Sequence, residues 1–193
     1  MRLSILDRGQ TIGTRALFAF IRAVSRQPVL DVVKMAAYRP DFYGRLMQAV
    51  THEAMRGPST WSVGDRELMA AVVSKANECE FCVNAHTATA ARAYGDGVKV
   101  AAALSNLETA PIEEPLRVTL RMLRTLTREH TVGPDDMRTV LAAGVSRTQI
   151  EDALAVCFAF NVVNRLADAF EFFVPEPDAF EAGAKYLLTR GYR

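Results

Sequence analysis

Two cysteines and a histidine lie close together in residues 77–95, which read NECEFCVNAHTATAARAYG. Cys79 and Cys82 form a C-x-x-C pair, and His86 follows four residues after Cys82. Residues four apart on a helix are about 5–6 Å apart at Cβ, so the Cys82 thiol and the His86 imidazole can meet on one helix face. We expect Cys79 at the N-terminal edge of that helix, where free N–H groups and the helix dipole favour a thiolate.

Such a group of side chains suits thiol redox chemistry. A thiolate is the reactive form of cysteine, and a helix N-terminus or an imidazole promotes its formation. The thiolate can attack a peroxide oxygen and become a sulfenic acid, which a second thiol then converts to a disulfide. The pattern therefore predicts a redox-active dithiol, Cys79 and Cys82, with His86 as the base.

A histidine that acts as a base needs a group to orient it. Glu67 lies in the helix expected over residues 64–77, and His86 lies in the helix expected over 80–94. If these two helices pack as an antiparallel pair, the chain brings His86 back towards Glu67, and the two side chains form a proton relay. Glu78 and Glu80 flank Cys79 more closely, but we expect both to face solvent at the turn.

Two other interpretations of the cysteines stay open. Cysteine, histidine and carboxylate are all zinc ligands, but a structural zinc site takes four ligands, and there is no second C-x-x-C or H-x-x-x-H. Inert core cysteines are the other alternative. A c-type haem site is excluded because Val83, and not histidine, follows the second cysteine. We favour the dithiol and expect no bound metal and no cofactor.

The segments that carry these side chains, and almost all of the rest of the chain, are predicted to be helical. Alanine, leucine and methionine are abundant, and alternating β-branched runs are missing. Pro40, Gly95, Gly97 and Pro134 mark helix boundaries. The pattern predicts one all-α domain over residues 1–193, with an N-terminal helical extension over residues 1–30. The expected helices cover residues 12–25, 29–38, 41–55, 64–77, 80–94, 97–105, 113–128, 134–143, 147–172 and 177–190.

The composition and charge of the chain indicate which kinds of protein, partner and cellular compartment fit the sequence. Half of the residues are hydrophobic, which is enough for one core without a metal or disulfide. The net charge is +1 with no basic stripe, which argues against a nucleic-acid partner. The apolar run over residues 16–21 is too short to span a membrane. Three cysteines do not form a secreted disulfide framework, so we expect a cytoplasmic protein.

Several other residues could bear on function, but their sequence patterns are less specific than that of the cysteine pair. We expect Cys157 to be a small core residue, Trp61 to be packed, and His52 and His130 to lie on the surface. Four polar residues share one face of the helix expected over 147–172, and they form either a solvated stripe or a buried hydrogen-bond network beside the site or a subunit contact. These four are Asn161, Asn164, Arg165 and Asp168.

The pattern E-x(11)-C-x-x-C-x-x-x-H, formed by Glu67, Cys79, Cys82 and His86, resembles the signature of the alkyl hydroperoxidase D / carboxymuconolactone decarboxylase family. The segments VCFAFNVVNRLADAF (156–170) and YLLTRGYR (186–193) are similar to the peroxidase-related branch. The resemblance covers roughly residues 35–193, with a family core at about 35–175. It implies an all-α, alkyl hydroperoxidase D-like helical bundle that assembles as a homo-oligomer, either a dimer, a trimer or a hexamer.

The resemblance also implies roles for the four residues. Cys82 corresponds to the cysteine that passes through sulfenic acid, Cys79 to its resolving partner, and His86 and Glu67 to the proton relay. The implied function is a thiol-dependent hydroperoxidase or disulfide reductase in antioxidant defence. Its partners would be a small hydroperoxide and an external dithiol reductant, of a lipoyl or thioredoxin-like type.

One position departs from the family pattern. The founding hydroperoxidase has a second histidine between its cysteines, where this chain has Phe81. The relay here is therefore expected to be shorter. Decarboxylases of the family generally lack the cysteine pair, yet an alternative remains: a lyase or isomerase of a small lactone or carbonyl acid, with His86 and Glu67 as its acid–base pair. A redox-sensing oligomer without turnover is a third possibility.

Overall fold

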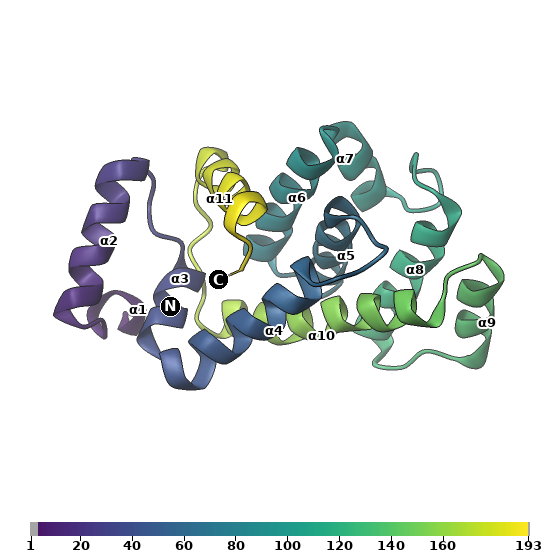
Figure 1. Cartoon of the computed structure of the whole chain (residues 1–193), viewed down its shortest axis with the longest axis horizontal. Helices are drawn as coiled ribbons and strands as arrows, with labels where there is room; N and C mark the ends of the chain where they lie inside the picture. The colour runs from purple at the N-terminus through teal and green to yellow at the C-terminus, as the bar shows by residue number, and fades with distance from the viewer. Residues whose placement is uncertain (1–3, 193) are drawn as a thin grey trace.

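The computed structural model describes residues 4–192, and every regular element in that range is a helix, so the predicted all-α fold is confirmed (Figure 1). The elements are α1 (Ile5–Arg8), α2 (Ile12–Ser25), α3 (Asp31–Tyr38), the π-helix η1 (Pro40–Gly44), α4 (Arg45–Arg56), α5 (Val63–Ala76), α6 (Glu80–Tyr94), α7 (Gly97–Ser105), α8 (Glu114–Glu129), α9 (Pro134–Ala142), α10 (Arg147–Ala169) and α11 (Pro177–Arg190).

Local capping explains most of these boundaries. The Ser62 hydroxyl accepts a hydrogen bond from the Asp65 N–H, and the Asp65 carboxylate accepts from Ser62 N–H, so α5 starts with a capping box. Gly95 ends α6 in a left-handed conformation, with φ of 67°. The helix predicted over 147–172 ends earlier, at Ala169, because the chain turns through Glu171, whose φ is 47°. Helix α3 ends at Tyr38, just before Pro40, as predicted, and Pro40 then starts the π-helix η1.

The helical hairpin of α5 and α6 lies at the centre of the bundle. Helix α5 is buried continuously from Arg66 to Ser74, because α6, α8 and α10 all pack against it. Helix α11 covers α6, and α4 packs on α10 (Figure 1). Burial on all sides explains why α5 carries almost no polar face. A charged residue in the middle of α5 must therefore find its partners inside the protein.

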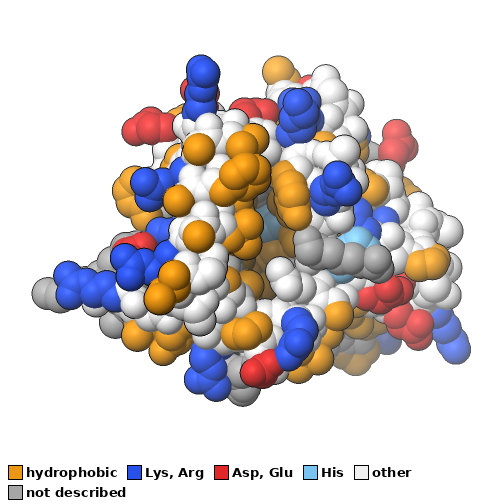
Figure 2. All heavy atoms as spheres, turned by 60° about the vertical axis from the view of Figure 1, so that its left-hand side comes forward, with side chains coloured by type: hydrophobic (Ala, Val, Ile, Leu, Met, Phe, Trp, Pro, Cys, Tyr) orange, Lys and Arg blue, Asp and Glu red, His pale blue; other side chains and the backbone are white. Residues whose placement is uncertain are grey.

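Helix α2 lies at one end of the molecule, apart from the α5–α10 bundle (Figure 1). No residue of α2 is buried, and Ile12, Leu17, Phe20 and Val24 are each more than half exposed. On the face that includes α2, hydrophobic side chains gather around a hollow (Figure 2). Within residues 4–192, no helix is both long enough and apolar enough to cross a lipid bilayer.

Candidate active site

Glu67 and His86 are in direct contact across the α5–α6 hairpin, as the sequence analysis expects. Oε2 of Glu67 lies 2.7 Å from Nδ1 of His86. The Glu67 side chain is completely buried, and only 6% of the His86 side chain is exposed. An ionised carboxylate can only accept hydrogen bonds, so Nδ1 of His86 carries the proton and Nε2 is the basic nitrogen.

Arg56, the last residue of α4, neutralises this buried carboxylate. Its Nη2 lies 2.6 Å from Oε1 of Glu67 and also donates to the carbonyl of Leu187, at 3.2 Å. Its Nη1 donates to the carbonyl of Met55. Burial by itself would raise the pKa of Glu67, but the hydrogen bond and charge of His86 and the pairing with Arg56 outweigh it and lower that pKa. Glu67 is therefore a carboxylate at neutral pH.

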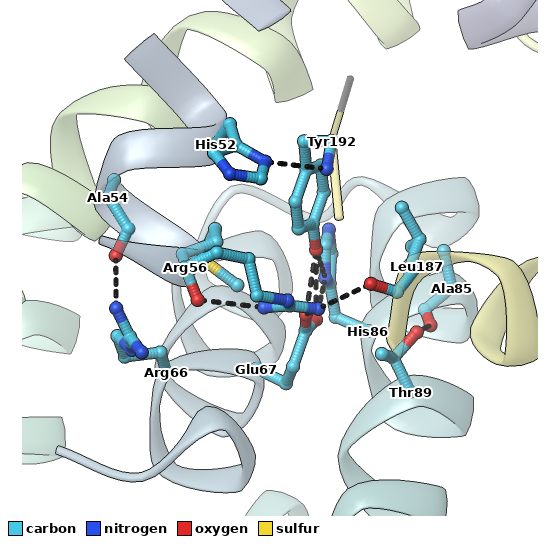
Figure 3. A network of polar contacts seen from close by, with 11 residues as sticks. His52, Ala54, Arg56, Arg66, Glu67, Ala85, His86, Thr89, Leu187 and Tyr192 are labelled. Carbon is cyan, nitrogen blue, oxygen red and sulfur yellow. Dashed lines mark hydrogen bonds and ion pairs between the residues drawn. The ribbon is translucent and has the colours of Figure 1, made fainter. Parts of the chain in front are cut away.

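Tyr192 completes the surroundings of the carboxylate (Figure 3). Its hydroxyl lies 2.8 Å from Oε1 and 3.1 Å from Oε2 of Glu67, and 3.5 Å from Nδ1 of His86. Burial and the charge of Glu67 raise the pKa of Tyr192 well above its usual value. The phenol therefore keeps its proton and donates a hydrogen bond to Glu67. The backbone N–H of Tyr192 donates in turn to Nδ1 of His52, at 3.2 Å.

The other side of the imidazole ring faces apolar groups. Phe160 on α10 meets the His86 ring edge to face, with ring centroids 4.3 Å apart. Among residues 4–192, Nε2 of His86 has no hydrogen-bond partner. Because Nδ1 is held by Glu67, this nitrogen is the one available to a thiol, a water or a substrate.

Cys79 and Cys82 are free, buried thiols at the start of α6. Cys79 is the N-cap residue of α6, as predicted. The hydrogen bond of Cys82 with Cys79 raises the pKa of Cys82 well above its usual value, and burial and the charges of Cys79 and Asp168 add to the effect. Cys82 thus holds its proton at neutral pH. Burial, with a smaller contribution from Cys82, also raises the pKa of Tyr43 in the π-helix.

Phe81, where the founding hydroperoxidase has its second histidine, has a structural environment here. Its ring packs edge-on against Phe172 and Phe180, with centroid distances of 5.3 and 5.5 Å. The Phe81 side chain has no titratable group, so it cannot take the part of a second histidine in a proton relay. Glu78 and Glu80 are exposed, as expected, and leave Glu67 as the carboxylate in contact with His86.

Arg56 and Tyr192 are not predicted from the sequence, and the expectation that His52 lies on the surface is wrong. His52 is half-buried and accepts the backbone hydrogen bond of Tyr192. One signal was available: His52 and Arg56 are four residues apart in a predicted helix, so they share a face. Nothing in the sequence places Tyr192 next to Glu67. In the described part of the chain, no three His, Cys, Asp or Glu side chains are arranged to hold a metal ion.

The four polar residues on one face of α10 are partly a solvated stripe and partly a buried hydrogen-bond network, so each of the two alternatives holds for some of them. Asn164 is fully buried and its Oδ1 accepts from Ser74 Oγ at 3.1 Å, whereas Arg165 and Asp168 are exposed. Asn161 is half-buried and donates through Nδ2 to the Cys157 carbonyl at 3.0 Å. Cys157 is a buried core residue, as predicted. The buried half of this face therefore ties α10 to α5.

Comparisons with known proteins agree with this architecture. Residues 40–111, which include Glu67 and the cysteine pair, match the model of the carboxymuconolactone decarboxylase family. A solved structure of an uncharacterized peroxidase-related protein from Silicibacter sp. TM1040 is 25% identical, with a TM-score of 0.74; the match covers 89% of this chain and 90% of that one. No curated protein matches the chain.

A second solved structure shows the same fold at lower identity. It is the alkylhydroperoxidase AhpD core of an uncharacterized peroxidase-related protein from Ralstonia eutropha JMP134. The two sequences are 21% identical, the TM-score is 0.74, and the match covers 90% of this chain and 91% of that one. The family match lies on the α5–α6 hairpin that carries Glu67, the dithiol and His86, and the fold around it is shared. Residues 40–111 are therefore similar to the carboxymuconolactone decarboxylase family, and the chain as a whole shares its fold with two peroxidase-related proteins.

Proposed function

We propose that the protein is a thiol-dependent hydroperoxidase that works through the Cys79–Cys82 dithiol. One observation carries the proposal: a buried Glu67–His86 pair, joined at 2.7 Å, lies on the hairpin whose second helix bears both thiols. An oriented imidazole one helical turn from a cysteine is the arrangement that activates a thiol nucleophile.

The first step uses Cys82 as the nucleophile. Because the pKa of Cys82 is raised, its thiol needs a base at the moment of attack, and Nε2 of His86 takes the proton. The sulfur attacks the terminal oxygen of a hydroperoxide, an S–O bond forms and the O–O bond breaks. The leaving alkoxide takes the proton back from His86, which yields an alcohol and a sulfenic acid on Cys82.

The second step forms the disulfide. The Cys79 sulfur attacks the sulfenic sulfur of Cys82, the S–O bond breaks, and one water leaves with the Cys79 proton. An external dithiol, of a lipoyl or thioredoxin-like type, then reduces the disulfide to two thiols and becomes oxidised itself. Throughout the cycle Glu67, paired with Arg56, holds the tautomer of His86 and stabilises the imidazolium.

Burial of the site favours small substrates. Cys79 is 1% exposed and Cys82 is 2% exposed, so hydrogen peroxide and short alkyl hydroperoxides fit this site better than bulky lipid hydroperoxides. We propose an antioxidant role in the cytoplasm, in a homo-oligomer. Neither a metal nor a bound cofactor takes part in the cycle.

Hydroperoxide-dependent oxidation of a dithiol tests the proposal. We expect Cys82→Ser to abolish turnover, and His86→Gln to lower it by about 10²- to 10⁴-fold, the usual contribution of a general base. The matched control is Cys157→Ser, which removes a buried thiol far from the pair in sequence and should leave turnover unchanged. Equal rates in all four proteins would remove the proposal.

The acid–base pair also supports a second candidate function. Glu67 and His86 contact each other without help from either cysteine, and the matching family model is named for a decarboxylase. A lyase or isomerase acting on a small lactone or carbonyl acid would keep its activity in the double variant Cys79→Ser/Cys82→Ser. A redox sensor without turnover would form a reversible disulfide, visible when thiols are counted at graded redox potentials, but would consume no hydroperoxide.

A further inference from the structure

We propose that Tyr192 is a positioning residue of the Glu67–His86 pair. Its hydroxyl fixes the Glu67 carboxylate so that Oε2 stays directed at Nδ1 of His86. The catalytic meaning of this role rests on the proposed function, whereas the role itself can be measured without turnover. Tyr192 lies 125 positions from Glu67 and outside the segment that matches the family model.

The two carboxylate oxygens of Glu67 have different hydrogen-bond partners. Oε1 of Glu67 accepts from Nη2 of Arg56 at 2.6 Å and from the Tyr192 hydroxyl at 2.8 Å. Oε2 accepts from His86 at 2.7 Å, and the Tyr192 hydroxyl lies 3.1 Å away. Two donors therefore hold Oε1, and the carboxylate cannot rotate away from His86 without breaking both bonds. Arg56 alone would leave a freer carboxylate, because one contact allows the group to pivot.

The backbone places this hydroxyl accurately. Gly191, just before Tyr192, has φ of 71°, a left-handed value that glycine adopts at low cost. A Cβ atom on Gly191 would lie 2.6 Å from the ring of His52. That ring accepts the Tyr192 N–H at 3.2 Å. His52 and Arg56, one turn apart on α4, thus hold the residue 192 backbone and the Glu67 carboxylate together.

The phenol ring is held as well as its hydroxyl. The Arg56 guanidinium lies 5.1 Å from the centre of the Tyr192 ring, at a distance typical of a cation–π contact. The Tyr192 and His86 rings are nearly parallel, at 19°, with centroids 6.4 Å apart (Figure 3). A buried tyrosine hydroxyl usually finds a hydrogen-bond partner. Here that partner is the buried carboxylate of Glu67.

A matched pair of tyrosines makes the test specific. Tyr192→Phe removes a hydroxyl that donates to a buried carboxylate. Tyr94→Phe is the control, because the Tyr94 hydroxyl donates to a carboxylate oxygen of Asp65 at 2.5 Å, on the same hairpin but away from His86. Gly191→Ala is the second test variant: its Cβ would collide with His52 and displace Tyr192 while the phenol stays intact.

The readout is the ¹⁵N spectrum of the histidine rings, which is simple because the chain has three histidines, and His86→Gln assigns the signals of His86. Besides Glu67, the titratable groups that contact the Glu67–His86 pair in the described residues are Arg56 from α4 and Tyr192 itself, so each variant is recorded from pH 5 to 9. We expect the wild type and Tyr94→Phe to show the Nδ1–H tautomer of His86. Tyr192→Phe and Gly191→Ala should show a mixture of the two tautomers.

In the peroxidase assay, Tyr192→Phe and Gly191→Ala should lower kcat/KM by about 10- to 100-fold, as expected for the loss of a hydrogen bond to a charged group. Tyr94→Phe should not. A His86 tautomer that is unchanged in a folded Tyr192→Phe protein would overturn the positioning role. If the tautomer shifts but the wild type consumes no hydroperoxide, the positioning role stands and the proposed function fails.

Discussion

Glu67 and His86 lie 19 positions apart in the chain and 2.7 Å apart at Oε2 and Nδ1. The α5–α6 hairpin makes this possible, because the tight turn over residues 77–79 returns α6 along α5. The turn also places Cys79 at the N-terminus of α6 and Cys82 one turn before His86. One local structure therefore positions both cysteines, His86 and Glu67.

Removal of the buried charge should destabilise the protein strongly. We expect Glu67→Gln to lower the free energy of unfolding by about 3–5 kcal/mol, because Arg56 would be left buried without its partner. Urea unfolding followed by circular dichroism measures this change. Glu108→Gln is the control, because Glu108 pairs with Arg121 at the surface, and its loss should have little effect. Similar losses in the two variants would contradict the buried ion pair.

The lowered pKa of Glu67 sets a pH dependence of stability. Because the folded protein holds this carboxylate ionised to lower pH than the unfolded chain does, the stabilisation is complete above the ordinary pKa of glutamate, about 4.3. It is lost as the pH falls through the lower pKa of the folded state. The difference in unfolding free energy between wild type and Glu67→Gln should therefore shrink below about pH 4, in urea titrations between pH 3 and 7. A constant difference would argue against it.

Cys79 controls the ionisation of Cys82. The hydrogen bond with Cys79 is the largest cause of the raised pKa of Cys82, so Cys79→Ser should lower this pKa. We expect Cys82 to be alkylated by iodoacetamide at lower pH in Cys79→Ser than in the wild type, as measured by mass spectrometry of the peptide. Both proteins should carry Cys157→Ser to remove the third thiol. An unchanged pH profile would mean that the hydrogen bond with Cys79 does not raise the pKa of Cys82.

Close packing of the hairpin depends on a glycine. A Cβ atom on Gly64 would lie 2.7 Å from the ring of Tyr94, so Gly64→Ala should destabilise the protein by about 1–3 kcal/mol. Gly13→Ala, in α2, is the control: nothing lies within 4 Å of its Cβ, and it should stabilise the protein by about 0.4–1 kcal/mol. Thermal unfolding distinguishes the two. Stabilisation by both substitutions would show that α5 and α6 pack more loosely.

The hydrogen bond between Ser74 and Asn164 ties α5 to α10 in the core. Ser74→Ala would leave Oδ1 of Asn164 buried without this donor, at a cost of about 1–3 kcal/mol. Ser105→Ala, at the exposed end of α7, should change the free energy of unfolding much less. Chemical denaturation checks both variants. A neutral Ser74→Ala would mean that the amide finds another donor.

The sequence predicts the helices and the α5–α6 site well, because both depend on local rules. Caps at Ser62 and Gly95 bound the two helices, and the hairpin between them brings Glu67 into contact with His86. Arg56 and Tyr192 could not be found this way. Their contacts with Glu67 depend on how α4 and the residues after α11 fold over the hairpin, and no periodicity within one helix encodes that arrangement. The early end of α10 depends likewise on a left-handed Glu171.

The buried carboxylate limits how this chemistry can be transplanted into another scaffold. A graft of residues 63–94 would carry both sulfurs, the imidazole and Glu67, but it would bring an anion without its counter-cation. In a new apolar interior, Glu67 would take up a proton. It would then no longer accept the hydrogen bond of Nδ1 of His86 as a carboxylate. A graft that keeps Glu67 ionised must therefore combine separate segments of the chain. It needs Arg56 from the last turn of α4 and Tyr192 as well as the α5–α6 hairpin.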